Sequence, residues 1–79
     1  MIISVEISYY PLTNDFSAPV NELLDLLEKS KLQVEPGKMS TIITGQFSEV
    51  FKLLESSLYK LFEKYPSVFT MKVSNTCPL

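Results

Sequence analysis

The chain has 79 residues, a length typical of one small domain. Its hydrophobic core is thin, because a chain this short buries only about 60% of the surface that it exposes when unfolded. Hydrophobic residues make up 46% and charged residues 20%, proportions typical of folded globular proteins. The charged residues are nine acids and seven lysines, and the chain has no arginine, histidine or tryptophan.

These absences exclude a Ser–His or Cys–His nucleophile pair and an imidazole base. One cysteine without histidine cannot supply the ligands of a zinc site. A net charge of −2 leaves no basic stripe for a nucleic acid. We therefore expect a protein that is not an enzyme and that binds neither a metal nor a nucleic acid.

We expect neither a targeting signal nor a membrane span. The start of the chain has no basic segment and reaches a carboxylate at Glu6, too early for a signal peptide. No apolar run approaches the roughly 18 residues that a membrane span requires. The lone Cys77 cannot form an internal disulfide, and it stands third from the end, not fourth as in a prenylation signal. The expected location is the cytoplasm, with no membrane partner.

The first half of the chain predicts a strand, a helix and a second strand. Residues 2–10 alternate apolar and polar side chains, the period of a half-buried strand. A helix is expected from Ser17 to about residue 28, with an apolar face of Phe16, Val20, Leu23, Leu24 and Leu27. A short strand follows at residues 32–35. Pro36-Gly37 suit the two central positions of a type II turn, where glycine accepts a positive φ.

The second half repeats the pattern of strand, helix and strand. Residues 39–44 are rich in β-branched side chains, and Gly45 is expected to end this strand. A helix is predicted from about residue 47 to 64, and Pro66 stops it. Its predicted core stripe is Phe47, Val50, Phe51, Leu54, Leu58, Leu61, Phe62 and Tyr65. Residues 68–74 alternate again and form the last strand.

This order, β-α-β-β-α-β, predicts an α+β ferredoxin-like fold: one four-stranded antiparallel sheet with both helices on one face. The whole chain, residues 1–79, is then a single domain with the first and third strands in the centre. The side chains expected to face the helices are Ile3, Val5, Ile7, Phe69, Met71 and Val73. The opposite face carries Ser4, Glu6, Ser8, Thr70, Lys72 and Ser74.

That polar face has two interpretations. It is either a solvated sheet face, which antiparallel sheets commonly have, or a subunit interface, which we favour because so small a domain gains from association. Glu6 and Lys72 are its only charges on the two neighbouring strands. A cross-strand ion pair is the simpler interpretation of these two charges, and contact of Glu6 with a cationic or amine-bearing ligand is the alternative.

Three segments of the sequence resemble the YkoF-like thiamine-binding proteins. They are Ser-Val-Glu-Ile-Ser-Tyr-Tyr-Pro-Leu at 4–12, Gly-Lys-Met-Ser-Thr-Ile-Ile-Thr-Gly at 37–45 and Val-Ser-Asn-Thr-Cys-Pro at 73–78. The resemblance implies a cytoplasmic, non-catalytic, ferredoxin-like protein that binds thiamine or its hydroxymethylpyrimidine half and needs no cofactor. YkoF itself carries two such domains and this chain one, so the resemblance implies a homodimer or homotetramer in place of the tandem copy.

By the same resemblance, Ser40 and Thr41 are expected to form hydrogen bonds with the pyrimidine. Glu6, Ser8, Tyr9 and Asn75 are their expected neighbours in the ligand site. A flat aminopyrimidine with a permanent thiazolium cation needs an aromatic wall, placed hydroxyls and a negative charge, which these residues supply. Asn75 is expected about a strand length from Ser40 in the same domain. Either the site is shared between subunits or Asn75 forms a turn.

A different class of function stays open on the sequence alone. A regulatory or protein-interaction module of the same fold, with no small-molecule ligand, would carry the same polar sheet face. Calorimetric titration with thiamine separates these two interpretations.

Overall fold

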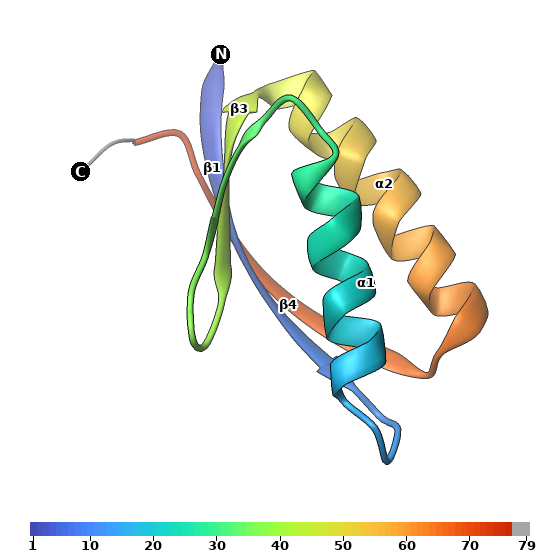
Figure 1. Cartoon of the computed structure of the whole chain (residues 1–79). Coiled ribbons are helices and arrows are strands. Elements are labelled where there is room, and N and C mark those ends of the chain that lie inside the picture. The colour runs from blue at the N-terminus through green and yellow to red at the C-terminus, as the bar shows by residue number, and fades with distance from the viewer. Residues whose placement is uncertain (77–79) are drawn as a thin grey trace.

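The computed structural model describes residues 1–76 and contains the six predicted elements in the predicted order (Figure 1). They are β1 (Ile2–Pro11), α1 (Ser17–Glu28), β2 (Gln33–Pro36), β3 (Thr41–Gln46), α2 (Phe47–Lys64) and β4 (Ser67–Ser74). The bounds differ from the predicted ones by no more than two residues. Cys77 and the last two residues lie outside the described part of the chain.

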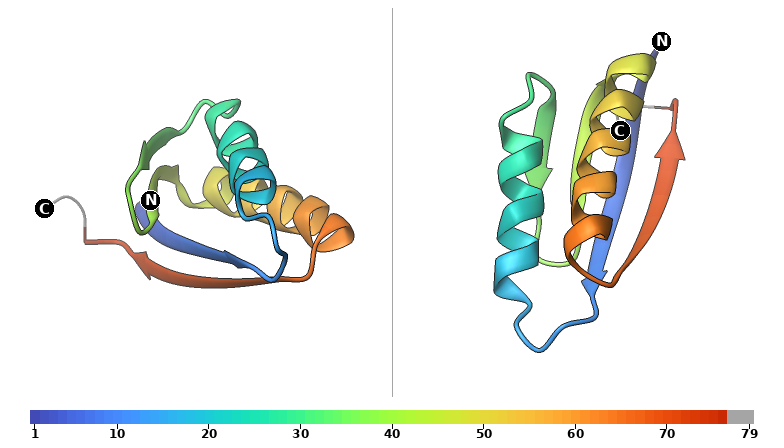
Figure 2. Two further views of the ribbon diagram at one scale, coloured as in Figure 1. Left: turned by 60° about the horizontal axis from the view of Figure 1, so that its bottom comes forward. Right: turned by 90° about the vertical axis from the view of Figure 1, so that its right-hand side faces the viewer.

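The four strands form one sheet in the order β2-β3-β1-β4, and every neighbouring pair is antiparallel. The first and third strands are therefore central, as the sequence predicts. Both helices cover the same face of the sheet, and the other face is left open (Figure 2). This is the ferredoxin-like arrangement. The register places Val5 of β1 between Ile43 of β3 and Val73 of β4.

The core lies between the helices and the two central strands. Its fully buried members are Ile3, Val5, Ile7, Leu23, Leu27, Ile43, Val50, Leu54 and Leu61. An aromatic cluster extends this core toward β4: the rings of Tyr9 and Phe69 stack at 4.3 Å, and Phe62 meets Phe69 edge-on at 5.5 Å. The period-two and helical patterns of the sequence thus identify the centre of the core correctly.

Two parts of the predicted core are exposed in the structure. Phe47, Phe51 and Phe62 on α2 keep 38–53% of their surface in solvent, and so do Met71 and Val73 on β4, at 43% and 50%. Phe16, before α1, is 61% exposed. The side chains on α2 and β4 are exposed because β4 is an edge strand and, within residues 1–76, no helix lies beyond α2 to cover its outer side.

The tip of the β2–β3 hairpin also differs from the prediction. Pro36 pairs with Thr41 as the last residue of β2, and the Gly37 N–H donates to the Ser40 carbonyl at 2.8 Å. The two residues at the tip are therefore Lys38 and Met39, so the predicted Pro36-Gly37 turn is wrong. The φ of Gly37 lies outside the left-handed region. Glycine is needed there for space, because a Cβ atom would lie 2.8 Å from the Ser40 carbonyl oxygen.

A polar cluster joins the two helices at the end of α2. The Glu22 carboxylate of α1 lies 3.0 Å from the Lys64 ammonium and accepts a hydrogen bond from the Tyr65 hydroxyl at 3.2 Å. The hydrogen bond to Glu22 raises the pKa of the Lys64 ammonium. Partial loss of solvent raises the pKa of the Tyr65 phenol, and Glu22 raises it further.

Within residues 1–76, neither helix combines the length and the apolarity needed to cross a membrane.

Candidate functional site

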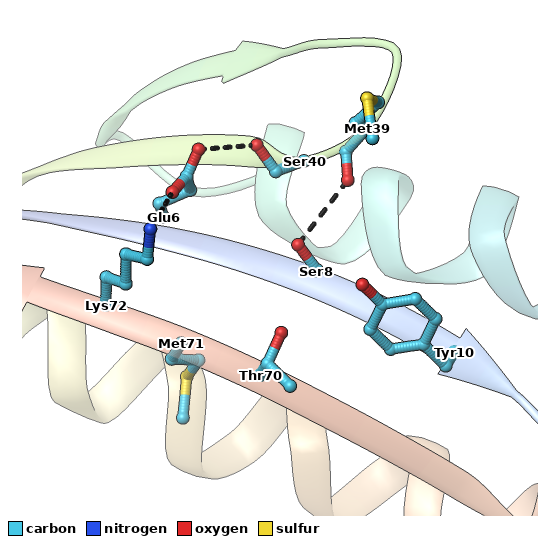
Figure 3. A pocket seen from close by; sticks show the side chains of 8 residues that line it. All are labelled: Glu6, Ser8, Tyr10, Met39, Ser40, Thr70, Met71 and Lys72. Carbon is cyan, nitrogen blue, oxygen red and sulfur yellow. Dashed lines mark hydrogen bonds and ion pairs between the residues drawn. The ribbon is translucent and has the colours of Figure 1, made fainter.

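A cavity of about 460 Å³ lies on the open face of the sheet, which we call the polar cavity (Figure 3). Strands β1 and β4 form its floor, and the β2–β3 hairpin bounds one side. Its lining residues are Glu6, Ser8, Tyr10, Met39, Ser40, Thr70, Met71 and Lys72. The side chain of Met71 points to the helix side of the sheet, because Met71 pairs with the buried Ile7. Polar side chains gather here because alternate residues of β1 and β4 point away from the helices.

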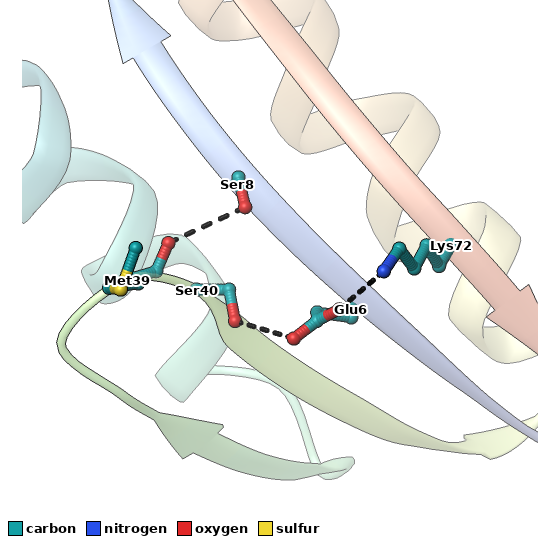
Figure 4. Close-up of polar contacts among 5 residues, drawn as sticks. All are labelled: Glu6, Ser8, Met39, Ser40 and Lys72. Atoms are coloured by element: carbon teal, nitrogen blue, oxygen red, sulfur yellow. Dashed lines mark hydrogen bonds and ion pairs between the residues drawn. The ribbon is translucent and has the colours of Figure 1, made fainter.

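Glu6 is the charged centre of the polar cavity. Its carboxylate Oε2 accepts a hydrogen bond from the Ser40 Oγ at 2.8 Å, and its Oε1 lies 4.0 Å from the Lys72 Nζ (Figure 4). The lysine side chain is 88% exposed and that of Glu6 43% exposed, so the ion pair is weak and easily opened. The serine therefore orients the carboxylate, while the lysine is a counter-ion that a ligand cation can replace.

The other end of the polar cavity holds a hydroxyl and an aromatic ring. The Ser8 Oγ donates to the Met39 carbonyl at 3.4 Å, a long and weak bond (Figure 4). Tyr10 follows two residues later on the same face of β1 and is 53% exposed. Thr70 pairs with Ser8 from β4 and adds a second hydroxyl. This end can therefore offer a flat apolar surface beside groups that both donate and accept hydrogen bonds.

The donor set of the polar cavity suits an organic cation. Within residues 1–76 no cluster of three or more histidine, cysteine, aspartate or glutamate side chains could hold a metal ion. The cavity contributes one carboxylate, several hydroxyls and a tyrosine. A carboxylate attracts positive charge, and a tyrosine ring adds to the attraction through its face.

A second, smaller cavity of about 170 Å³ lies on the helix side of the sheet. Its lining is mainly apolar: Ile7, Tyr9, Val20, Leu23, Leu24, Gly37, Lys38, Met39, Ser40 and Thr41. Thr41 is 7% exposed there. The Tyr9 hydroxyl is engaged with the Ser67 Oγ at 2.8 Å. Ser40 lines both cavities because it lies in the hairpin tip, directly before the start of β3.

The structure brings together three of the six predicted site residues, Glu6, Ser8 and Ser40. Tyr9 and Thr41 point to the helix side and line the smaller cavity. Asn75 lies in neither cavity. It directly follows Ser74, which pairs with Ser4, whereas the cavity begins at the pair of Glu6 and Lys72. Asn75 is three positions beyond Lys72, about 10 Å along a strand.

Sequence reasoning did not select Tyr10, Thr70 and Met39 as site residues. The alternation of β1 and β4 already places Tyr10 and Thr70 on the face of Glu6. That signal could have found them. Met39 contributes its backbone carbonyl to the polar cavity from the hairpin tip. No sequence pattern predicts which backbone groups a hairpin tip exposes.

Comparison with known proteins gives a family and a fold. A model of the YKOF-related family matches residues 2–79. A structure from Streptococcus pneumoniae superposes with a TM-score of 0.87 at 17% identity, covering 94% of this chain and 86% of its own. One from Thermotoga maritima, provisionally described as a thiamine biosynthesis/salvage protein, gives 0.87 at 15%, covering 96% and 85%. One from Methanocaldococcus jannascii gives 0.83 at 22%, covering 96% and 81%. No protein of curated function matches this sequence.

Proposed function

We propose that this chain, which belongs to the YKOF-related family, is a non-catalytic cytoplasmic protein that binds thiamine or its hydroxymethylpyrimidine half and acts as a homo-oligomer. The Thermotoga maritima structure, with its provisional description in thiamine biosynthesis or salvage, supports the ligand class through the shared fold. The polar cavity is the proposed binding site.

The hydrogen bond between Ser40 and Glu6 is the observation that carries this proposal. It fixes a carboxylate on an open sheet face where the only nearby cation, among the residues lining the cavity, is the exposed Lys72. The thiazolium cation of thiamine would replace the Lys72 ammonium beside Glu6. The aminopyrimidine would lie toward Ser8 and Tyr10, where its donors and acceptors meet hydroxyls and its flat face meets a ring.

The size of the polar cavity fits this ligand. Sites for small molecules typically occupy about 300–1,000 Å³, and the polar cavity of about 460 Å³ falls in that range. The smaller cavity, at about 170 Å³, falls below it. A ligand with a pyrophosphate group is disfavoured because the chain has no arginine to hold it.

Calorimetric titration with thiamine and with hydroxymethylpyrimidine tests the proposal. Glu6→Gln keeps the shape and the acceptor for Ser40 but removes the charge. This substitution should weaken the binding of thiamine by about 1–2 kcal/mol, a modest loss because the carboxylate is partly solvated. Binding of the uncharged pyrimidine should weaken much less, because it carries no cation for the carboxylate to attract. Ser40→Ala should weaken both ligands by about 0.5–1.5 kcal/mol.

Thr41→Val is the matched control, because Thr41 is the next residue on the chain but faces the other cavity. The affinity of the Thr41→Val variant for thiamine should equal that of the unmodified protein. A loss of affinity in Thr41→Val alone would move the ligand to the helix side of the sheet. If neither thiamine nor hydroxymethylpyrimidine gives heat of binding in the calorimeter, the proposal is contradicted and a protein-interaction module is favoured.

A further inference from the structure

The outer edge of β4 is long, regular and unprotected. Its eight residues pair with β1 in an unbroken register from Pro11–Ser67 to Ser4–Ser74, so the strand contains no bulge. It contains no proline, and its one charge is Lys72. Proteins usually shield such edges with charges, prolines, bulges or short strands. The opposite edge, β2, is shielded in this way: it has four residues and ends in Glu35-Pro36.

The register shows which backbone groups of β4 face outward. The Leu12 N–H donates to the Pro66 carbonyl, so even-numbered residues of β4 exchange hydrogen bonds with β1. The N–H and C=O groups of Phe69, Met71 and Val73 therefore point away from the sheet. No strand lies on that side within residues 1–76.

An apolar surface adjoins this edge on the helix side. Phe47, Phe51 and Phe62 fall within about 60° of one another around α2, since a helix turns about 100° per residue. The contact between Phe62 and Phe69 shows that this stripe faces β4. Met71 and Val73 continue it on the strand. We call these five exposed side chains the β4–α2 surface: Phe47, Phe51, Phe62, Met71 and Val73.

We infer that the β4–α2 surface and the edge of β4 bind a second copy of this chain, with the two β4 strands antiparallel and the two sheets joined into one of eight strands. This deepens the homo-oligomer of the proposed function by naming its contact. A two-fold axis presents the same strand from both copies, so each free N–H meets a free C=O and each apolar side chain meets another. A small domain with a thin core gains most from such burial.

The sequence of β4 is compatible with pairing to itself. Because only odd-numbered residues face outward, the axis that gives the longest overlap passes beside Thr70 or Met71. Lys72 then lies opposite Val68 or Thr70 of the second copy. The register that would oppose the two lysines is shorter and repulsive. Charge and overlap thus favour the same arrangement.

The test measures self-association of the intact chain without ligand, so its result is independent of thiamine binding. Met71→Lys and Val73→Lys each place a charge in the proposed contact and should weaken self-association about tenfold or more. Ile42→Lys is the matched control: Ile42 is 37% exposed on the open face of β3, where it would interrupt only face-to-face stacking of sheets. Sedimentation equilibrium gives the dissociation constants, and circular dichroism confirms that each variant is folded.

Hydrogen exchange supplies a measurement that needs no substitution. The amides of Phe69, Met71 and Val73 should become protected as the protein concentration rises, and become exposed again on dilution. Weakened association in the two edge variants, with Ile42→Lys unchanged, would support the inference. A 9.0 kDa monomer at all micromolar concentrations would overturn it, and so would a dimer that only Ile42→Lys dissociates.

Discussion

Removal of one hydroxyl from the core should make this protein more stable. Ser57 lies on the buried stripe of α2 between Leu54 and Leu61 and is 1% exposed. Its Oγ has no hydrogen-bond partner within the described residues. Ser57→Ala takes this oxygen out of the core and leaves the backbone unchanged.

The expected gain follows from three terms. A buried hydroxyl without a partner costs about 1–3 kcal/mol. Alanine favours the helix over serine by up to about 0.7 kcal/mol. The space left by one oxygen is smaller than a methyl group, whose loss costs about 1 kcal/mol. The net gain in the free energy of unfolding is therefore about 1–2 kcal/mol. In a domain of this size each kcal/mol raises Tm by about 4–8 °C.

Urea denaturation followed by circular dichroism measures this gain. Ser56→Ala is the matched control: it makes the same change in helix preference and removes only an exposed hydroxyl, whose long bond to the Leu53 carbonyl at 3.2 Å water can replace. The difference between the two variants isolates the burial of the Ser57 oxygen. A urea midpoint for Ser57→Ala at or below that of Ser56→Ala would show that the buried hydroxyl of Ser57 does not destabilise the protein.

Three further predictions concern packing, pH and the site. Gly45→Ala places a Cβ atom 2.6 Å from the Leu32 Cδ2, so the end of this partly buried side chain must shift, and the free energy of unfolding in a thermal melt should fall by about 1 kcal/mol. Hydrogen bonds from Ser17 lower the pKa of the Asp15 carboxyl from its ordinary 3.8, so the stability that it contributes is present above that pKa. The advantage of the unmodified protein over Asp15→Asn should therefore hold at neutral pH and disappear as the pH falls through the lowered pKa. Lys72→Met removes the competing cation beside Glu6 and should raise the affinity for thiamine several-fold in calorimetry, most at low salt.

The sequence predicts most of the fold because its patterns are local and consistent. Alternation in β1 places Val5 toward the helices and Glu6 and Ser8 on the open face, as the structure shows. The order of elements leaves one compact topology, with β1 and β3 central. These features depend on the periodicity of the side chains and on the order of the elements along the chain. Both can be determined from consecutive residues.

The features that sequence did not predict depend on distance across the molecule. Helical spacing places Phe51 and Phe62 on the apolar face of α2, but it cannot tell how far α2 covers the sheet. The edge strand β4 extends beyond the part of the sheet that α2 covers, so these side chains stay partly exposed. The position of the hairpin tip depends on how β2 and β3 pair, which the Pro36-Gly37 turn chemistry does not fix. Ser40 and Thr41 are adjacent in sequence, yet Thr41 lines only the smaller cavity, whereas Ser40 also lines the polar cavity.

Whether thiamine binds in the polar cavity is measured by an NMR titration of thiamine into nitrogen-15-labelled protein. The largest amide shifts should fall on Glu6, Ser8 and Ser40, since these residues surround the proposed position of the ligand. Shifts concentrated at Tyr9, Thr41 and Leu23 would place the ligand in the smaller cavity and contradict the proposed site, as would the absence of shifts at saturating thiamine.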